Sequence, residues 1–489
     1  MCESDSAACA SSQNSSRLPP VAVIGGGITG LVAAWRLSRA GRGVRLFEAS
    51  SRMGGAIRTL HERDGWMPEA GPNTLLVKTR EFHALIDDLG LAARLMQANP
   101  GAAKRFLIRG GRIRAVPQSP VGALVTPLLS PPAKLRIAAE VLFASRRERA
   151  EDLSLADFAR EHYGREFVDY ALNPLVAGIY AGDPEKLSAR LSFPFLWQAE
   201  RTHGSLIRGQ VAQMRARLRQ GGPKAALISF AGGVQTLTDT LAAALPDGVA
   251  ALDAPVKSLT PVSGAPPVPG ARTSASEARW RIRWQDALRG GGGAREEIFS
   301  SVVLALPAAA LARLEIAGAR PLAPLAAVDY PPVASLFVGY RRGQIAHPLD
   351  GFGVLAPERE RRRFLGVLFS SSLFPGRAPD GCAALTVMVG GTRQPRLARL
   401  PSDELMREVL PDVSRLLGIR GGPVFTHHQL AERAIPQYNL GYERHLAVVE
   451  ACESAHSGLH IGGHVRDGIS VPACVASGER LAARVLGEA

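Results

Sequence analysis

Apolar residues near the start of the chain follow the pattern of a strand, a helix and a second strand. Residues 21–24 (VAVI) form a short continuous apolar run, as in a buried strand, and a glycine-rich turn follows. Residues 31–41 carry apolar side chains at helical spacing and end at Gly41, a typical helix stop. Residues 44–50 (VRLFEAS) form the second strand pattern. This order predicts a βαβ unit and therefore a parallel sheet in an α/β fold.

The pattern changes to helical periodicity in the middle of the chain, at residues 131–150 and 153–176. The first of these stretches places apolar side chains on one helical face and basic side chains around it: Leu135, Ala138, Ala139 and Leu142, with Lys134, Arg136, Arg146 and Arg147. A basic amphipathic helix can lie on an anionic membrane surface or pack against another domain. The residues alone leave both interpretations open.

Strand patterns return in the second half. In residues 279–285 (RWRIRWQ), Trp280, Ile282 and Trp284 alternate with arginines, which predicts a half-buried strand. Apolar runs predict further strands at 301–307, 334–340 and 384–391. A last glycine-rich segment, 458–486, is predicted to form a strand, a turn and a helix. Glycine, proline and serine punctuation predicts loops at 261–277 and 290–293.

The length and charge of the chain narrow its class. With 489 residues, of which 46% are hydrophobic, it is long enough for two or three domains. Its 58 Lys and Arg against 44 Asp and Glu give a net charge of +14, which suits acidic small molecules or an anionic membrane surface. The excess is spread as arginine, without a basic tail or an aromatic-basic stripe, so we expect no nucleic-acid partner.

The cysteines and the first residues indicate a reducing compartment. The five cysteines form no CxxC pair and no His/Cys cluster at metal spacing, so we expect reduced thiols and no metal site. Residues 1–18 are rich in Ser and Ala, contain acidic residues and lack an apolar core. This stretch is therefore interpreted as a disordered tail rather than a secretory signal.

A glycine motif at the first turn predicts a dinucleotide site. Gly25, Gly27 and Gly30 fit GxGxxG between a strand and a helix, which is where a pyrophosphate meets a helix N-terminus. Glu48, at the end of the second strand, is placed to accept hydrogen bonds from ribose hydroxyls and would repel the 2′-phosphate of NADP.

The residues after Glu48 favour FAD over NAD. A second glycine pair, Gly54 and Gly55, and a basic residue, Arg58, follow the second strand, where a flavin protein needs the chain to return past the pyrophosphate. This E-x-x-x-R-x-G-G-x-x-R arrangement resembles the amine-oxidase-type flavoenzymes. The late segment GGHVRDG before a helix resembles their second flavin contribution.

Stretches spread over nearly the whole chain resemble the protoporphyrinogen oxidase family, of the FAD- and oxygen-dependent type. They occur in order as EAGPNTLL (69–76), KRFLIRGGRIRAVPQSP (104–120), NPLVAGIYAGDPEKLSAR (173–190), SFAGGVQTL (229–237), YPPVASLFVGY (330–340), HPLDGFGVLAP (347–357), FSSSLFPGRAP (369–379), MVGGTRQP (388–395) and AIPQYNLGY (434–442).

The resemblance implies a Rossmann-like FAD-binding domain, a mixed α+β substrate domain and a helical membrane-binding domain. The implied division is a tail at 1–18, FAD-binding parts at 19–105, 216–320 (with some substrate-domain elements) and 431–489, the helical membrane-binding domain at 106–215, and the substrate-binding domain at 321–430.

The resemblance also assigns residues to the flavin. Its FAD contacts fall on Gly25, Gly26, Gly27, Ile28, Thr29, Gly30, Glu48, Ala49, Gly55, Ala56, Arg58, Gly71, Pro72, Asn73, Thr74, Val256, His464, Ile469, Ser470 and Val471. His464 departs from the family, which has a smaller residue or an amide there. A histidine beside a flavin tunes its reduction potential or donates a hydrogen bond, and we assign it no catalytic role.

For the substrate, the resemblance implies contacts at Arg105, Phe374, Leu355, Asn73 and the carbonyl of Gly178. Arg105 matches the arginine that binds a propionate, and a guanidinium suits a carboxylate because it donates two parallel hydrogen bonds. Phe374 and Leu355 match residues that sandwich the macrocycle, although either side chain could equally be ordinary core. No protein side chain is assigned as catalytic, because flavin N5 carries the chemistry.

The implied activity is oxidation of protoporphyrinogen IX to protoporphyrin IX in porphyrin and haem synthesis. Three hydride transfers remove six electrons, and dioxygen, reduced to hydrogen peroxide, is the expected acceptor. Coproporphyrinogen III oxidation is the nearest alternative, and amine or polyamine oxidation is a more distant one. The expected setting is a cytoplasmic protein held peripherally, as a monotopic protein, on an anionic membrane surface. The resemblance also allows a homodimer and a hand-off of product to ferrochelatase.

Overall fold

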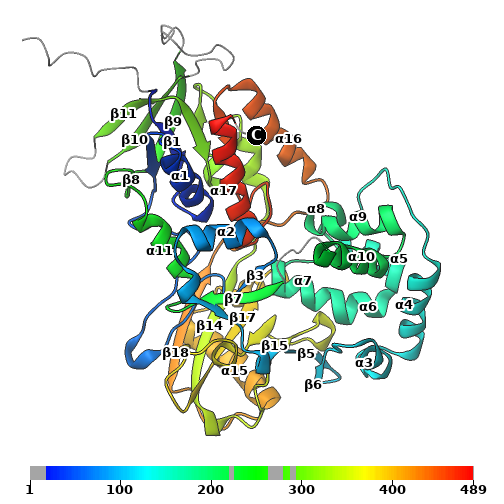
Figure 1. The fold of residues 1–489 in the computed structure, drawn as a ribbon. Coiled ribbons are helices and arrows are strands. Elements are labelled where there is room, and N and C mark those ends of the chain that lie inside the picture. The colour runs from blue at the N-terminus through cyan, green and yellow to red at the C-terminus, as the bar shows by residue number, and fades with distance from the viewer. Residues whose placement is uncertain (1–17, 220–224, 263–278, 287–292, 488–489) are drawn as a thin grey trace, which may run out of the picture.

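The computed structural model describes residues 18–219, 225–262, 279–286 and 293–487. Four sheets and a group of helices make up this part of the chain (Figure 1). The predicted tail at 1–18 and the predicted loops at 261–277 and 290–293 fall almost entirely outside the described residues.

The first sheet contains the predicted βαβ unit and is parallel throughout. Its strand order is β19 (Leu459–Ile461), β12 (Ser301–Leu304), β1 (Val21–Ile24), β2 (Val44–Phe47) and β8 (Ala250–Ala251). Helices α1 (Ile28–Arg39) and α17 (Val471–Leu486) pack side by side on this sheet (Figure 1). The first and last parts of the chain therefore build one layer together.

A second, four-stranded sheet packs against the first. It contains β11 (Ala294–Phe299), β10 (Arg279–Gln285), β9 (Val256–Val262) and β13 (Glu315–Ile316). Along β10, Trp280, Ile282 and Trp284 are buried while Arg281 and Arg283 are exposed, which confirms the predicted half-buried strand. The buried side chains form a core with residues of β1, β2 and β12.

A seven-stranded sheet forms the lower part of the molecule in Figure 1. Its order is β18 (Phe425–Ala431), β14 (Val333–Arg341), β17 (Cys382–Gly390), β16 (Gly366–Leu368), β15 (Gly351–Leu355), β5 (Lys104–Arg109) and β6 (Arg112–Ala115), with α15 (Ser402–Leu417) packed on it. Thus residues 106–115, inside the range expected to be helical, are strands of this sheet. They are strands because β5 pairs with β15, far along the chain, and buries Phe106 and Ile108.

Helices dominate residues 120–219, as the periodicity predicted. They are α3 (Pro120–Val125), α4 (Pro131–Phe143), α5 (Leu155–Tyr163), α6 (Arg165–Phe167), α7 (Asn173–Tyr180), α8 (Ala189–Ser192), α9 (Pro194–His203) and α10 (Leu206–Arg219). In α4, Ala133 and Glu140 are buried, whereas Leu135 and Leu142 are about 70% exposed (71% and 67%). The apolar face noted in the sequence is therefore turned to solvent. No helix in the described ranges combines the length and the apolar character needed to span a bilayer.

A small three-stranded sheet connects these regions. Its order is β3 (Leu75–Val77), β7 (Ala226–Phe230) and β4 (Leu95–Gln97), and it is antiparallel. The remaining helices are α2 (Arg80–Asp88), α11 (Gln235–Ala243), α12 (Ala308–Leu311), α13 (Ser370–Leu373), α14 (Pro395–Ala398) and α16 (Glu443–Ala455).

Candidate active site

The glycine turn after β1 is closely packed on one side and open on the other. A Cβ on Gly25 would lie 2.4 Å from the carbonyl oxygen of Ala305, and a Cβ on Gly30 would lie 1.9 Å from that of Gly25. Beside Gly27, by contrast, a Cβ would meet no atom within 4 Å. The turn therefore needs glycine at its first and third motif positions, and its second motif position borders open space.

Helix α1 begins at this open space. Gly27 is its N-cap residue, and no side chain accepts a hydrogen bond from its first turn, which contains Ile28, Thr29 and Gly30. The first turn also contains no acidic residue. Uncapped backbone N–H groups and the helix dipole together favour an anion such as a pyrophosphate at this position.

Glu48 closes the other side of the turn. Its Oε2 accepts a hydrogen bond from the Gly26 N–H at 2.7 Å, and its Oε1 accepts from the Ser50 N–H and hydroxyl at 2.9 and 2.8 Å. The exposed Ala49 lies between them, and the Ala254 N–H donates to the Glu48 carbonyl, which brings Val256 at the start of β9 near this edge. A carboxylate fixed here is placed to receive ribose hydroxyls.

The second glycine pair packs directly on the first turn. The Gly54 N–H donates to the Gly26 carbonyl at 2.8 Å, and a Cβ on Gly55 would lie 3.1 Å from Gly27 Cα. Gly55, Ala56 and Arg58 are exposed toward solvent. The sequence argument that the chain returns past the pyrophosphate position therefore agrees with the observed backbone path.

The 71–74 loop lies against this returning segment. A Cβ on Gly71 would lie 2.0 Å from the Ala56 carbonyl oxygen, so only glycine fits there. The neighbouring Ala70 N–H donates to the Arg58 carbonyl at 2.8 Å. Pro72, Asn73 and Thr74 are all partly exposed. These contacts bring the predicted flavin residues of three separate segments to one place.

The C-terminal contribution reaches the same place through α17. Thr29 donates its hydroxyl to the Cys474 carbonyl at 3.1 Å, which fixes α17 beside α1. Ile469 and Ser470 precede α17, Val471 is its first residue, and Ser470 caps the helix by accepting from the Ala473 N–H.

His464 lies in the glycine-rich loop between β19 and α17. Burial lowers the pKa of its imidazole to about 4, so the ring is neutral at neutral pH. Its Nε2 lies 3.0 Å from the Tyr330 hydroxyl, which accepts from the Ala308 N–H and so has its proton free to donate to His464. His464 is thus a neutral, oriented ring, and the pair with Tyr330 was not foreseen from the sequence.

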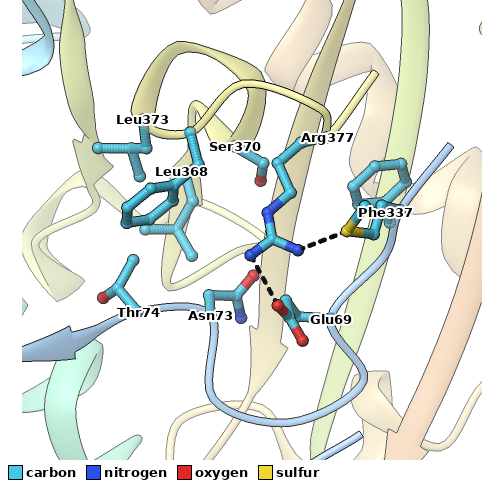
Figure 2. Close-up of a pocket in the computed structure, with 10 residues that line it drawn as sticks. Glu69, Asn73, Thr74, Phe337, Leu368, Ser370, Leu373 and Arg377 are labelled. Atoms are coloured by element: carbon cyan, nitrogen blue, oxygen red, sulfur yellow. Dashed lines mark hydrogen bonds and ion pairs between the residues drawn. The ribbon is translucent and has the colours of Figure 1, made fainter. Parts of the chain in front are cut away.

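A small inner cavity adjoins the 71–74 loop (Figure 2). Its volume is about 10 Å³, and Asn73, Thr74, Leu373 and Phe374 are among its lining residues. Phe374 is only 2% exposed and packs with Ala102 and Leu373. The structure therefore brings Asn73 and Phe374 together as expected, but with the Phe374 ring buried in a local core.

A larger outer cavity, of about 540 Å³, contains the predicted propionate-binding arginine. Arg105 lines it, together with the polar side chains of His83, Gln97 and Asn99 and the apolar side chains of Phe352 and Leu373. Leu373 lines both cavities, so the outer and inner cavities are neighbours. This volume falls in the range of small-molecule sites.

Leu355 and Gly178 contact each other, and neither is among the residues that line the two cavities. A Cβ on Gly178 in α7 would lie 2.9 Å from the Leu355 Cδ2 in β15. Arg393 links the two segments that make this contact, because it donates to the Ala356 carbonyl at 2.7 Å and to the Asn173 side chain at 2.7 Å. The sequence reasoning did not single out Arg393, because its role depends on two segments that meet only in the fold.

The sequence reasoning also missed an ion pair at the inner cavity. Arg377 and Glu69 both line this cavity, and their side chains pair at 2.8 Å (Figure 2). Glu69 stands in the quoted stretch EAGPNTLL and Arg377 in FPGRAP, so both were within recognised motifs. Neither was identified, because their partnership joins distant parts of the chain.

The donor set fits a dinucleotide with an attached ring system. The open face at Gly27, the uncapped α1 N-terminus and the Glu48 carboxylate suit the pyrophosphate and ribose of FAD. The 71–74 loop contacts the returning segment at Ala56 and lines the inner cavity with Asn73 and Thr74.

Comparisons with known proteins match nearly the whole chain. The family described as flavin containing amine oxidoreductase matches residues 28–486. Protoporphyrinogen oxidase 2 of Arabidopsis thaliana, chloroplastic/mitochondrial, is 31% identical, over 95% of this chain and 93% of that protein. Coproporphyrinogen III oxidase of Staphylococcus aureus is 26% identical, over 96% and 99%. A crystal structure of a protein from Exiguobacterium sp. 255-15 matches with a TM-score of 0.77 at 23% identity, over 97% and 100%, which shows a shared fold.

Proposed function

Since the chain belongs to the flavin containing amine oxidoreductase family and uses FAD, we propose that it oxidises protoporphyrinogen IX to protoporphyrin IX in porphyrin and haem synthesis. The observation that carries this proposal is the cavity of about 540 Å³ with Arg105 in its wall. This cavity shares Leu373 with the inner cavity, which Asn73 and Thr74 of the 71–74 loop line. The identity to a protoporphyrinogen oxidase over 95% of the chain supports it.

The residues of this chain bind and orient, and the cofactor supplies the redox chemistry. When bound, FAD would supply the redox chemistry, namely removal of two electrons from the substrate in each of three rounds, with dioxygen as the expected acceptor and hydrogen peroxide as its product. The glycine turn, Glu48 and the start of α17 are the residues that would hold the cofactor at its dinucleotide end. The 71–74 loop, whose Asn73 and Thr74 line the inner cavity, would contact the cofactor on the side of the substrate.

Arg105 is the residue that we assign to a substrate propionate. It is an exposed side chain at the mouth of the outer cavity, so it can meet a carboxylate without burying an uncompensated charge. Phe352 and Leu373 give the same cavity an apolar wall for the macrocycle. Orientation of one methylene bridge toward the flavin is the protein's main contribution to the rate.

Coproporphyrinogen III is the second candidate substrate. It carries four propionates instead of two, and the amides of Gln97 and Asn99 beside Arg105 offer further donors for carboxylates. The similarity to a coproporphyrinogen III oxidase over 96% of the chain favours the same alternative. Amine oxidation is disfavoured, because a cationic substrate would meet Arg105 at the cavity mouth.

The test is anaerobic reduction of the purified flavoprotein by each porphyrinogen separately. Fast bleaching of the flavin by protoporphyrinogen IX, followed by porphyrin fluorescence on admission of air, is the expected result. Faster bleaching by coproporphyrinogen III would assign the enzyme to the alternative substrate. Bleaching by neither compound would refute the proposal.

We further infer that the helices of residues 120–219 attach the protein peripherally to an anionic membrane surface. Large apolar side chains of four of these helices are exposed: Val125, Leu135, Leu142, Phe143, Phe195, Met214 and Leu218. Such side chains rarely gather on the surface of a protein that stays in water. Lys134, Arg136, Arg215, Arg217 and Arg219 add positive charge to the same helices. A cytoplasmic location, a homodimer and a hand-off of product to ferrochelatase stay predictions from the family resemblance.

A further inference from the structure

The geometry points to Arg377 as a positioning residue, which acts through its ion pair with Glu69 to hold the Leu373–Phe374 wall of the substrate site against the 71–74 flavin loop. The inference rests on the proposed function, because it assigns a role within that same site. Neither side chain was recognised from the sequence, and neither is assigned to binding or chemistry above.

The pair is deeply buried at the meeting point of three segments. Each side chain is 4% exposed. Arg377 follows α13 and Phe374, and Glu69 precedes the 71–74 loop. The Arg377 Nη2 that pairs with Glu69 also donates to the Ser229 hydroxyl of β7 at 2.6 Å. Figure 2 shows Arg377 extending from the α13 side of the cavity toward Glu69.

Every polar contact of Glu69 is with a donor. Its Oε1 accepts from the Val234 N–H at 2.9 Å and from Arg377, and its Oε2 accepts from the Thr59 hydroxyl at 2.6 Å. Burial raises the pKa of this carboxyl, and the charge of Arg377 opposes that shift. The guanidinium of Arg377 and the donors from Val234 and Thr59 favour the ionised form of this carboxyl.

Arg377 makes contacts that fix the orientation of its planar head group. Its Nη1 lies 3.0 Å from the Met67 Sδ, and its carbonyl accepts from the Met67 N–H at 3.3 Å. Its Cζ lies 5.8 Å from the centre of the Phe374 ring. Contacts on several sides restrict the guanidinium to one orientation, and this also restrains the backbone of the residues next to Arg377.

These contacts place the pair where it can affect both halves of the site. Glu69 stands two residues before the 71–74 loop on the flavin side. Arg377 stands three residues after Phe374 on the substrate side. Leu373 lines both the inner cavity and the outer one. A buried ion pair adds little stability over apolar residues of similar volume, so stability alone does not account for it.

The test separates positioning from charge balance with single and double variants. Arg377→Met alone leaves Glu69 as an unpaired buried anion, and Glu69→Gln alone leaves an unpaired cation, so both should lower the melting temperature. The double variant E69Q/R377M carries no unpaired charge. In it, the side-chain amide introduced at position 69 can still accept from the Val234 N–H through its oxygen and can donate to the Thr59 hydroxyl through its nitrogen.

We expect the double variant to regain the wild-type melting temperature to within a few degrees. We expect its kcat/KM for protoporphyrinogen IX to stay lower by roughly ten- to a hundredfold, because small misplacements of reacting groups cost that much. The visible circular dichroism of the bound flavin should also change, because the 71–74 loop shifts. A double variant with both wild-type kcat/KM and wild-type flavin dichroism would overturn the proposal.

A matched control is the Arg362–Asp412 pair, whose atoms lie 2.5 Å apart with both side chains 17% exposed and which lines neither cavity. The variant R362M/D412N should leave kcat/KM and the flavin dichroism unchanged. If the wild-type protein oxidises no porphyrinogen, the proposed function fails. The flavin dichroism of the E69Q/R377M variant then still decides the positioning role, since it needs no substrate.

Discussion

Replacement of His162 tests the buried charge cluster that joins three of the helices in residues 120–219. His162 of α5 places Nδ1 3.2 Å from Glu140 of α4 and Nε2 3.2 Å from Glu200 of α9. Its side chain is 7% exposed and those of both glutamates are 2% exposed. We expect His162→Gln to lower the free energy of unfolding, because it removes the imidazolium that bridges the two carboxylates. Glu200 then keeps its ion pair with Arg149, whereas Glu140 keeps no ion pair among the described residues.

The size of the loss follows from the burial of the cluster. Breaking a buried ion pair by removing one partner costs roughly 3–5 kcal/mol. Glu140 keeps donors from the Ser205 hydroxyl and the Leu206 N–H, and Glu200 keeps the Arg149 guanidinium, so the lower end of that range is expected. Part of the loss is also offset because glutamine can donate one hydrogen bond.

The loss should depend on pH in a defined direction. Burial acts to lower the pKa of His162, but hydrogen bonds to Glu140 and Glu200 outweigh it and raise the pKa above its usual value. A raised pKa stabilises the fold fully below the unfolded-state value of about 6.5, and this contribution disappears as the pH rises through the folded-state value. The difference between wild type and variant should therefore be largest in mildly acidic buffer and shrink toward alkaline pH.

Denaturant unfolding of the two proteins measures this difference. The measurements run between pH 6 and 9, about the range over which a histidine with a raised pKa titrates. Tryptophan fluorescence suits the assay, because Trp197 of α9 stacks on Phe158 one turn from His162. His61→Gln, at an exposed loop position, is the control and should unfold like the wild type. A difference that stays constant or grows with pH would refute the reasoning.

Three further substitutions test other parts of the structure. Arg105→Ala should raise KM for the porphyrinogen about tenfold or more, the value of a lost charged hydrogen bond, without changing flavin content, and an unchanged KM would remove Arg105 from the site. Gly30→Ala should abolish flavin binding, measured as absorbance of the purified protein, because its Cβ would lie 1.9 Å from a carbonyl oxygen; Gly41→Ala, with open space but a positive φ, should keep the flavin. The double change Leu135→Ser and Leu142→Ser should reduce cosedimentation with anionic vesicles while leaving oxidation of the substrate in detergent intact, and equal sedimentation would contradict the membrane proposal.

The parts of the fold that the sequence predicted are those that short-range rules determine. The strand at 21–24, the glycine turn and Glu48 lie within thirty residues, so their spacing alone defines the site at that end. The alternating tryptophans of β10 are buried on one face for the same reason. The FAD prediction is confirmed by the family match.

The parts that the sequence did not predict depend on contacts between distant segments. Residues 106–109 of β5 and the whole of β6 were placed in the helical range, because β5 is a strand only through its pairing with β15. The burial of Phe374 and the ion pair of Arg377 with Glu69 likewise need the seven-stranded sheet and the flavin loop to meet first. No local pattern in either segment encodes such a meeting.

The packing of α17 on α1 has a consequence for how the protein is made. On the ribosome, β1 and α1 emerge long before the strand and helix that complete their layer, β19 and α17. Until then, the apolar face of α1 that Val475 and Leu481 will cover stays accessible to chaperones and to other nascent chains. Stable cofactor loading therefore requires β19 and α17 to have been synthesised, and we expect a chain cut before Val471 to lose its flavin.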